Sequence, residues 1–417
     1  MPHIEHPIVI CDFKHKPYTY YDHHGSHIVN SWGDVPELTH KIKLDTVKAM
    51  CKKLRDPTIE NMYQYIRSQY DLMIKCLPYH MNPTWYQGMG SVIKDNAYSQ
   101  KTLSDHYVED VIFSEYEWLE KAVTGGYIDT YQKGIFDHVK AYDQKNSYNS
   151  VLMLPQFYIP TRIGDFEIRK NYLFQKSISN LSYGIYRCIV TGTHPFFRYN
   201  KNNYYTHFAI KIVADLGLKI DLIEDGQPNC LLWPQKKVIA GTRRPDTHFI
   251  PKSWSASRFV GDYIKVFNEA RLKHPECTIL KSFSSTLHGY LVKEHYEPQL
   301  KIGINDPMPE LPKVCEIIDV FDDGEFITLT IINHLRCYET PLARLKPFLY
   351  DRQRLEMYEK VLKPFGNKII KICIDGFLSA TIIPAFENNH PVMGNICADP
   401  AKNVEHLVID EHFKIVK

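Results

Sequence analysis

Alternating and periodic hydrophobic positions divide the chain into predicted strands and helices. Strands are predicted where apolar residues alternate or run continuously, at residues 7–13, 139–143, 183–192, 204–212 and 368–374. Helices are predicted where apolar residues recur at spacings of three and four, at residues 45–54, 61–76, 114–122, 257–273, 278–292 and 344–362. Residues 311–332 are typical of two strands around the turn Asp322-Asp323-Gly324. The pattern predicts an α+β protein whose domains interlock.

Length and charge bound the class of protein. The 417 residues are 44% hydrophobic and suggest two or three subdomains, and the net charge of +2 excludes a surface coated in basic residues. A local groove for nucleic acid stays open, because partners sense local potential. The most apolar stretch, residues 369–386, is interrupted by Lys371, Asp375 and Pro384, so no transmembrane helix is expected. The N-terminus meets charge within its first residues, so we expect no signal peptide and an intracellular, cytoplasmic protein.

The cysteines and one histidine cluster are candidate metal ligands. Ten cysteines include no C-x-x-C pair, and with no export signal reduced thiols are expected rather than disulfides. His23, His24 and His27 surround Gly25 and could be a metal cluster. No carboxylate accompanies them at a familiar spacing, so a surface turn is the favoured interpretation.

Two predicted strands end on an acidic residue, Asp143 and Asp375, with a helical pair rich in Lys and Arg between them. Carboxylates at adjacent strand ends can share two magnesium ions, which prefer oxygen ligands. Such ions activate an attacking hydroxyl and stabilise a departing pyrophosphate, while basic residues neutralise the phosphates. The alternative is that each Asp only caps a turn, which is common.

Four short motifs resemble those of family B DNA polymerases. Residues 142–150 (YDQKNSYNS) resemble the first palm motif, D-x-x-S-L-Y-P-S, and residues 281–289 (KSFSSTLHG) resemble K-x-x-x-N-S-x-Y-G of the fingers. Residues 372–377 (ICIDGF) resemble Y-x-D-T-D-S. Thr124-Gly125-Gly126 is similar to the Y-x-G-G signature of the protein-primed branch, and residues 184–188 and 205–207 are similar to its palm segments. The similarity covers roughly residues 110–417 in the expected order.

The resemblance implies a right-hand polymerase fold. Its palm would be an antiparallel sheet with flanking helices, its fingers a helical hairpin, and an additional α/β region would lie at the N-terminus. Residues 1–110 are expected to be a degenerate exonuclease or a partner-binding domain. Residues 111–250 would be the first part of the palm and residues 251–295 the fingers. Residues 296–417 would be the second part of the palm, with a minimal or absent thumb.

Roles follow from the resemblance by position. Asp143 and Asp375 would be catalytic and would hold two Mg²⁺ or Mn²⁺ ions. Tyr148 would stack beneath the incoming sugar and exclude a 2′-hydroxyl. The other residues expected to bind the nucleotide are Ser147, Lys281 on the triphosphate, Arg271 as its helper, and Gly289 beside the nascent base pair.

The activity implied is template-directed DNA synthesis. A deoxynucleoside triphosphate would be transferred to a 3′-hydroxyl or to a protein hydroxyl, in a viral or plasmid replicase that is complete or split into subunits. The expected partners are a DNA primer-template, deoxynucleoside triphosphates, and a terminal priming protein or second polymerase subunit. No membrane partner is expected.

Departures from the motifs leave other functions open. Ser285 stands where Asn is usual, His288 where Tyr is usual, and Cys373 where the first acid of D-T-D is usual. The N-terminal part has no D-x-E strand for proofreading, although Asp12 or Asp71 could be a remnant. One alternative is therefore a degenerate polymerase-like module that binds nucleic acid by stacking and phosphate contacts, or scaffolds a replication complex. The other is an unrelated α+β protein whose motif matches are due to chance.

Overall fold

The computed structural model divides into two compact units, residues 1–105 with 257–290 and residues 106–256 with 291–417. It describes residues 8–12, 18–29, 35–36, 40–44, 47–48, 51, 58–78, 81–83, 108–235, 251–295, 300–304, 306–322, 326–390 and 392–416. The helix predicted at residues 45–54 falls largely outside this set. In the described part of the chain, no helix has the length and hydropathy needed to cross a membrane.

The first unit contains a four-stranded sheet of order β3-β2-β1-β4, in which only the β1–β4 pair is parallel. Its strands are β1 (Ile8–Asp12), β2 (Tyr18–Asp22), β3 (Gly25–Val29) and β4 (His40–Lys43). His23 and His24 form the turn between β2 and β3, and Nε2 of His27 lies 3.0 Å from Oδ1 of Asp22. The histidine cluster is therefore a surface turn, as the sequence indicates.

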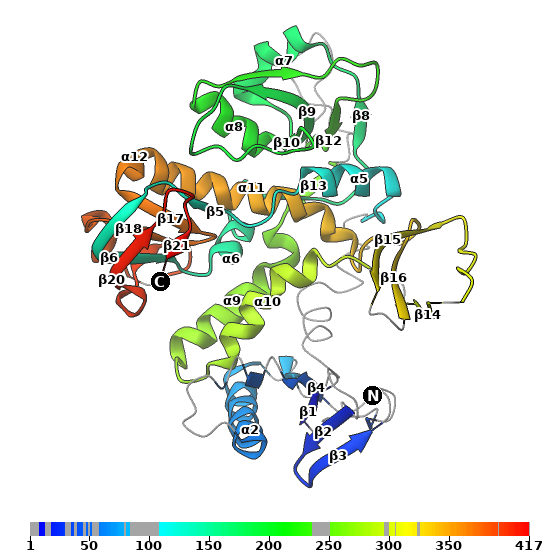
Figure 1. The fold of residues 1–417 in the computed structure, drawn as a ribbon, viewed down its shortest axis with the longest axis vertical. Coiled ribbons are helices and arrows are strands. Elements are labelled where there is room, and N and C mark those ends of the chain that lie inside the picture. Colours follow the sequence, from blue (N-terminus) through cyan, green and yellow to red (C-terminus); the bar gives the residue numbers. More distant parts are fainter. Residues whose placement is uncertain are drawn as a thin grey trace. The chain divides into compact units, whose positions relative to one another are not determined.

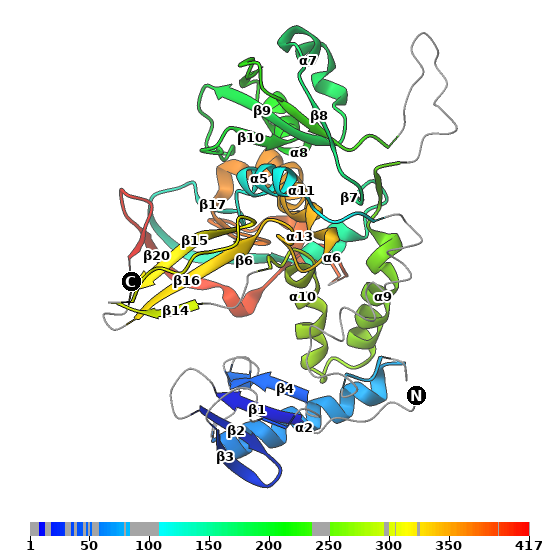
Figure 2. The same cartoon turned by 90° about the vertical axis from the view of Figure 1, so that its right-hand side faces the viewer.

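Among its described residues, the first unit also contains the helices α2 (Ile59–Cys76), α9 (Ser257–Lys273) and α10 (Ile279–Leu291). Figures 1 and 2 show α9 and α10 side by side as a hairpin. The ring of Phe283 lies 5.8 Å from that of Phe267 and 6.3 Å from that of Tyr70, so the apolar faces of all three helices meet. The Gln69 side chain accepts the backbone N–H of Thr278 at 2.7 Å. The predicted helices at 61–76, 257–273 and 278–292 are confirmed.

The second unit contains a seven-stranded antiparallel sheet (Figure 1). Its order is β21-β20-β6-β18-β17-β5, with β19 also paired to β6. The strands are β5 (Ile128–Thr130), β6 (Gly134–Gln144), β17 (Ile369–Cys373), β18 (Gly376–Ser379), β19 (Ile396–Ala398), β20 (Val404–Ile409) and β21 (Ile415–Val416). All strands formed by the described residues after Asp375 join this one sheet, so the C-terminal segment extends it.

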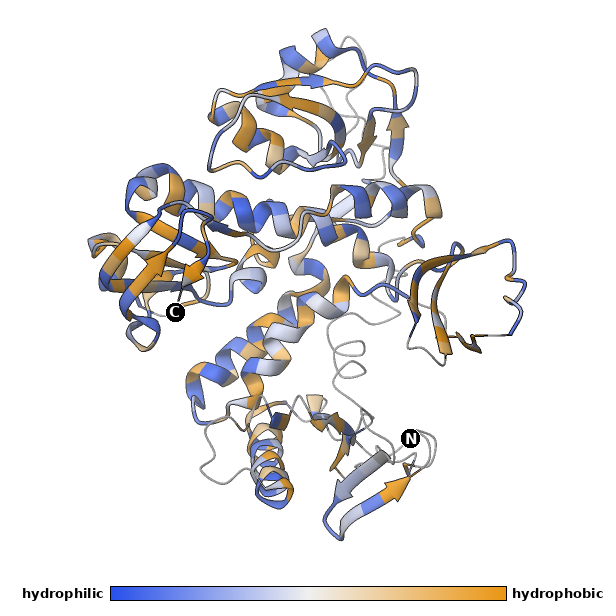
Figure 3. Ribbon diagram, in the orientation of Figure 1, coloured by the Kyte–Doolittle hydropathy of each residue, from blue (hydrophilic) through white to orange (hydrophobic). Residues whose placement is uncertain are grey.

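Apolar side chains cover both faces of this sheet. Val139 and Ile370 belong to one buried cluster, and Tyr142 and Phe377 stack at 5.0 Å within another. Figure 3 shows the hydrophobic residues gathered on these strands. Because successive side chains of a strand point to opposite faces, both faces of β6 are held by packing.

A second sheet in this unit contains β8 (Asp165–Glu167), β9 (Gly184–Thr191), β10 (Tyr204–Thr206), β11 (Lys219–Leu222) and β12 (Cys230–Leu232). The strand predicted at 204–212 is wrong beyond Thr206, where α8 (His207–Asp215) begins. The Thr206 hydroxyl caps this helix by accepting the backbone N–H of Ala209. The same hydroxyl donates to Asp351 at 2.7 Å. Residues 184–188 and 205–206 of the segments likened to the palm thus lie in a sheet separate from that of β6, and His207 begins α8.

A long helix links these two sheets. It consists of α11 (Lys346–Met357), a π-helical turn, η6 (Tyr358–Leu362), and α12 (Lys363–Phe365), and it contacts α5, α6 and α8. Leu355 and Met357 share one buried core with Tyr186 of β9 and Ile372 of β17. The predicted helix at 344–362 is confirmed, with its first residues in the 3-10 turn η5 (Pro341–Leu345). Further helices here are α5 (Phe113–Ala122), α6 (Ser147–Leu152), α7 (Asn171–Ser177), η4 (Ile178–Asn180), η7 (Gly366–Lys368), α13 (Pro384–Glu387) and η8 (Pro400–Lys402).

The predicted hairpin at residues 311–332 is also present. A three-stranded sheet of order β14-β16-β15 is formed by β14 (Leu300–Gly303), β15 (Cys315–Asp322) and β16 (Phe326–Asn333). A further pair joins β7 (Tyr158–Pro160) to β13 (Ser253–Ser255). All ten cysteines are free, and the mixed fold with several antiparallel sheets agrees with the predicted α+β class.

Candidate active site

Asp143 and Asp375, far apart in the sequence, lie at one end of two neighbouring strands, β6 and β18. Asp143 is the last residue but one of β6 and pairs with Gly376 of β18 on one side and Cys397 of β19 on the other. Asp375 lies in the two-residue turn between β17 and β18. Its carbonyl oxygen accepts the backbone N–H of Gln144 at 2.8 Å. The structure thus brings together the two acids that the sequence singled out.

The turn that carries Asp375 holds an unusual backbone conformation. Ile374 has a φ of +62°, which is costly for a β-branched residue. Its N–H donates to the carbonyl of Tyr127 at 2.5 Å, and its carbonyl accepts the side-chain amide of Gln353 at 2.7 Å. A Cβ on Gly126 would come within 3.0 Å of Cγ1 of Ile374, so this close approach favours glycine. Surrounding contacts therefore fix the position of Asp375.

The segment Thr124-Gly125-Gly126 is anchored by two arginines. Gly125 has a φ of +70°, a conformation that favours glycine. Arg354 donates to the carbonyl of Gly125 at 3.0 Å, and Arg198 donates to the carbonyl of Gly126 at 2.9 Å. The segment likened to the Y-x-G-G signature thus packs beside the turn that carries Asp375.

Two lysines hold the Asp143 carboxylate. Nζ of Lys145 lies 3.2 Å from Oδ2 and Nζ of Lys402 lies 3.5 Å from Oδ1 of Asp143. Lys402 also lies 3.0 Å from Oδ2 of Asp399. Partial burial opposes the charged form of Lys402, but its hydrogen bond to Asp399 and the charge of Asp143 outweigh this and raise its pKa. Sequence reasoning missed both lysines; the D-x-K spacing was a signal for Lys145, whereas only the fold reveals Lys402.

Ser147 and Tyr148 begin α6, directly after β6. The Ser147 hydroxyl is buried and donates to Oε1 of Gln144 at 2.9 Å. The ring of Tyr148 contacts that of Tyr350 edge to face at 5.8 Å. Burial raises the pKa of Tyr148, and the charges of Tyr350 and Asp375 add to this effect, so the phenol is neutral at pH 7.

The predicted fingers residues belong to the first unit. Lys281, Ser285 and Gly289 are exposed and share one face of α10, because residues four apart in a helix align. A Cβ on Gly289 would meet no heavy atom within 4 Å, so this face has room for a close neighbour. Arg271 lies in the last turn of α9, where burial lowers its pKa. Burial also lowers the pKa of His288.

The carboxylates of Asp143 and Asp375 are of the ligand type that suits a hard divalent cation, whereas Cys373 is not. Carboxylate oxygens of Asp143 and Asp375 are ligands that Mg²⁺ and Mn²⁺ prefer. Cys373 is exposed and ends β17, two residues before Asp375, where it offers a neutral thiol in place of an acid. Within the described ranges, no group of three or more His, Cys, Asp or Glu side chains is placed to hold a metal ion. The candidate ligands among the described residues are therefore the carboxylates of Asp143 and Asp375, and metal binding by them stays a prediction.

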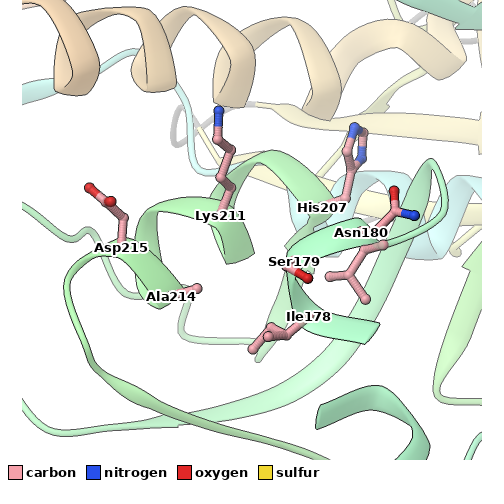
Figure 4. A pocket seen from close by; sticks show the side chains of 8 residues that line it. Ile178, Ser179, Asn180, His207, Lys211, Ala214 and Asp215 are labelled. Carbon is pink, nitrogen blue, oxygen red and sulfur yellow. The ribbon is translucent and has the colours of Figure 1, made fainter. Parts of the chain in front are cut away.

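A pocket of about 380 Å³ lies between η4 and α8 (Figure 4). Its lining includes none of the predicted site residues. Two charged groups of the lining are paired, since Lys211 lies 2.6 Å from Glu359 and Asp215 lies 2.7 Å from Lys363. Burial lowers the pKa of His207, a third lining residue, to about 3, so it is neutral at pH 7.

Comparison with known proteins identifies the fold. The fold is similar to that of Phi29 DNA polymerase. In complex with single-stranded DNA, that polymerase matches with a TM-score of 0.55 at 10% identity, over 99% of this chain and 89% of the other. Its complex with primer-template DNA and incoming nucleotides matches with a TM-score of 0.52 at 9% identity, over 100% and 90%. No family model and no curated protein sequence matches the chain.

Proposed function

We propose that this chain is a template-directed DNA polymerase of the protein-primed family B type. The observation that carries the proposal is the placement of Asp375, in the turn between β17 and β18, beside the end of β6 that carries Asp143, where the N–H of Gln144 donates to the Asp375 carbonyl at 2.8 Å. Support also comes from the similar fold of Phi29 DNA polymerase, which in some of the matched structures is complexed with primer-template DNA and in one of them with incoming nucleotides as well.

The proposed reaction is nucleotidyl transfer. A 3′-hydroxyl or a protein hydroxyl would attack the α-phosphorus of a deoxynucleoside triphosphate, and the bond to pyrophosphate would break. Asp143 and Asp375 would hold two divalent ions, which when bound supply Lewis acidity at the hydroxyl and at the phosphates. Tyr148 would lie against the sugar, and its neutral phenol would leave no room for a 2′-hydroxyl. In this proposal Lys281, with Arg271, would neutralise charge on the triphosphate.

The partners proposed are a DNA primer-template, deoxynucleoside triphosphates, and a priming protein or second polymerase subunit. Residues 1–110, with Asp12 at the end of β1, would be a degenerate exonuclease or a partner-binding domain.

The test is incorporation of labelled deoxynucleotides on a primed template, with Mg²⁺ and then Mn²⁺. Asp143→Asn and Asp375→Asn should each abolish incorporation. The matched control is Asp137→Asn, because Asp137 lies on the same strand with a side chain that is 65% exposed, and this variant should keep its activity. Thermal unfolding of each variant checks that the fold is intact. An active Asp375→Asn protein would overturn the two-metal assignment.

The second candidate is a polymerase-like module that binds nucleic acid without synthesis. One observation favours it: both oxygens of Asp143 contact lysine ammonium groups, and Cys373 offers no charge to compensate. Salt-sensitive DNA binding by a wild-type protein that incorporates no nucleotide with either metal ion would select this function.

A further inference from the structure

The lysines on Asp143 are held in place by the backbone of the sheet. The N–H of Lys145 donates to the carbonyl of Asn395 at 2.9 Å, and its carbonyl accepts the N–H of Gly394 at 2.7 Å. Both backbone groups of Lys145 are therefore fixed against the turn that precedes β19. Its side chain, 30% exposed, leads from that anchor to Oδ2 of Asp143.

Lys402 is anchored to the same strand from the other side. Asp399 donates its N–H to the carbonyl of Ala141 at 2.8 Å, and the side chain of Asn403 accepts the N–H of Ala141 at 2.9 Å. These bonds bracket η8 and set Lys402 over β6, where it bridges Asp399 and Asp143. Two independent anchors thus aim two ammonium groups at one carboxylate.

This arrangement sets up a competition for Asp143. A divalent ion bound to Asp143 would use the oxygens that now contact Lys145 and Lys402, and it would be repelled by both ammonium groups. The charge balance is unfavourable for a free ion, because Cys373 contributes no negative charge. A nucleoside triphosphate changes this balance, because its phosphate oxygens can accept hydrogen bonds from both ammonium groups.

We propose that Lys145 and Lys402 occupy Asp143 in the nucleotide-free protein and hold off free divalent ions, so that metal enters together with a nucleoside triphosphate. The inference rests on the proposed function for the identity of the ligand. Lys145 and Lys402 act here as positioning residues, through Asp143.

The experiment is a Mn²⁺ titration of the full chain without nucleotide, with free Mn²⁺ followed by electron paramagnetic resonance. Lys145→Met and Lys402→Met should each tighten Mn²⁺ binding, by roughly threefold to tenfold as for a partly exposed ion pair. Lys140→Met is the matched control, because Lys140 lies on β6 and its odd spacing from Asp143 places it on the opposite face. It should leave the Mn²⁺ affinity unchanged.

A second titration adds a deoxynucleoside triphosphate analogue with a non-hydrolysable α,β linkage. Wild-type protein should gain Mn²⁺ affinity on addition of the analogue, whereas the double lysine variant should gain less. Unchanged Mn²⁺ affinity in both single variants and the double variant would overturn the proposal. Lys→Gln variants at both positions separate this result from a folding defect.

The outcome is distinguishable from failure of the proposed function. If wild type incorporates nucleotides and loses this in Asp143→Asn, but the lysine variants bind Mn²⁺ as wild type does, the function stands and the lysine competition is refuted. If no protein incorporates nucleotides while the lysine variants bind Mn²⁺ more tightly, the competition stands and the polymerase proposal fails.

Discussion

The backbone N–H of Gln144 donates to the carbonyl oxygen of Asp375 at 2.8 Å. This single bond joins the end of β6 to the turn between β17 and β18. It places Asp375 next to Asp143, which precedes Gln144 and pairs with Gly376. A backbone bond between two sheet strands is insensitive to side-chain motion, so substitutions of either carboxylate should change chemistry rather than the fold.

Tyr148→Ala should admit ribonucleotides. Removing the ring that lies edge to face on Tyr350 opens space where a sugar 2′-hydroxyl would lie. The ratio of kcat/KM for a deoxynucleotide to that for the matching ribonucleotide should fall by about tenfold to a hundredfold, as for other steric pockets. Tyr199→Ala, at a partly exposed tyrosine, is the control. Unchanged sugar discrimination in Tyr148→Ala would show that another residue excludes ribonucleotides.

Cys373→Asp should lower the Mg²⁺ concentration needed for half-maximal incorporation. The substitution adds a carboxylate two residues before Asp375, at an exposed position at the end of β17. The expected shift is about threefold to tenfold, the effect of one added charge at a partly exposed site. Cys373→Ser keeps the position neutral and should leave the Mg²⁺ requirement unchanged. An identical Mg²⁺ titration for Cys373→Asp would place residue 373 outside the metal site.

Glu115→Gln should strongly destabilise the second unit. Glu115 and Arg344 form an ion pair in which both side chains are 0% exposed, with Nη2 of Arg344 at 2.7 Å from Oε2. Removing the negative charge leaves the buried guanidinium with only the neutral carbonyls of Glu109, Asp110 and Pro341 as partners. The uncompensated charge should cost about 3–5 kcal/mol in the free energy of unfolding. Urea unfolding at pH 7 measures this. Arg336→Met, at an ion pair whose arginine is 59% exposed, should cost less than about 1 kcal/mol; equal losses would contradict the prediction.

The folded protein should lose stability in acid through His207. Burial among aromatic rings lowers the pKa of His207 to about 3, against 6.5 for an exposed histidine. Between these values the unfolded chain binds a proton that the folded chain does not. Stability therefore falls as the pH drops from 6.5 to 3, by up to about 1.4 kcal/mol per pH unit.

His207→Gln tests this dependence. Urea unfolding at several pH values should give a shallower fall of stability for this variant between pH 6.5 and 3. His412→Gln, at a histidine whose side chain is 73% exposed, measures the effect of removing a surface histidine. Parallel curves for wild type and His207→Gln would mean that folding does not change the pKa of His207, which would contradict the prediction.

The sequence determined the elements that local periodicity controls. The helices at 257–273 and 278–292 were predicted because each buries one regular face, and the strand ending near Asp143 was predicted from its run of strand-forming residues. Helix α8 was missed because Thr206 both ends a strand and caps a helix within one largely apolar segment. The Thr206 hydroxyl also donates to Asp351, a partner distant in the sequence that the local pattern cannot reveal. Local pattern alone cannot distinguish these two uses of the same residues.

Only the tertiary structure decided which residues meet. The sequence marked Asp143 and Asp375 as candidates, but their adjacency depends on the pairing of β6 with β18. Lys402 reaches Asp143 only because Asp399 and Asn403 bind Ala141 of β6. Hydrogen bonds between distant strands leave no periodic trace in either strand, so the charge environment of the candidate metal site is a property of the fold.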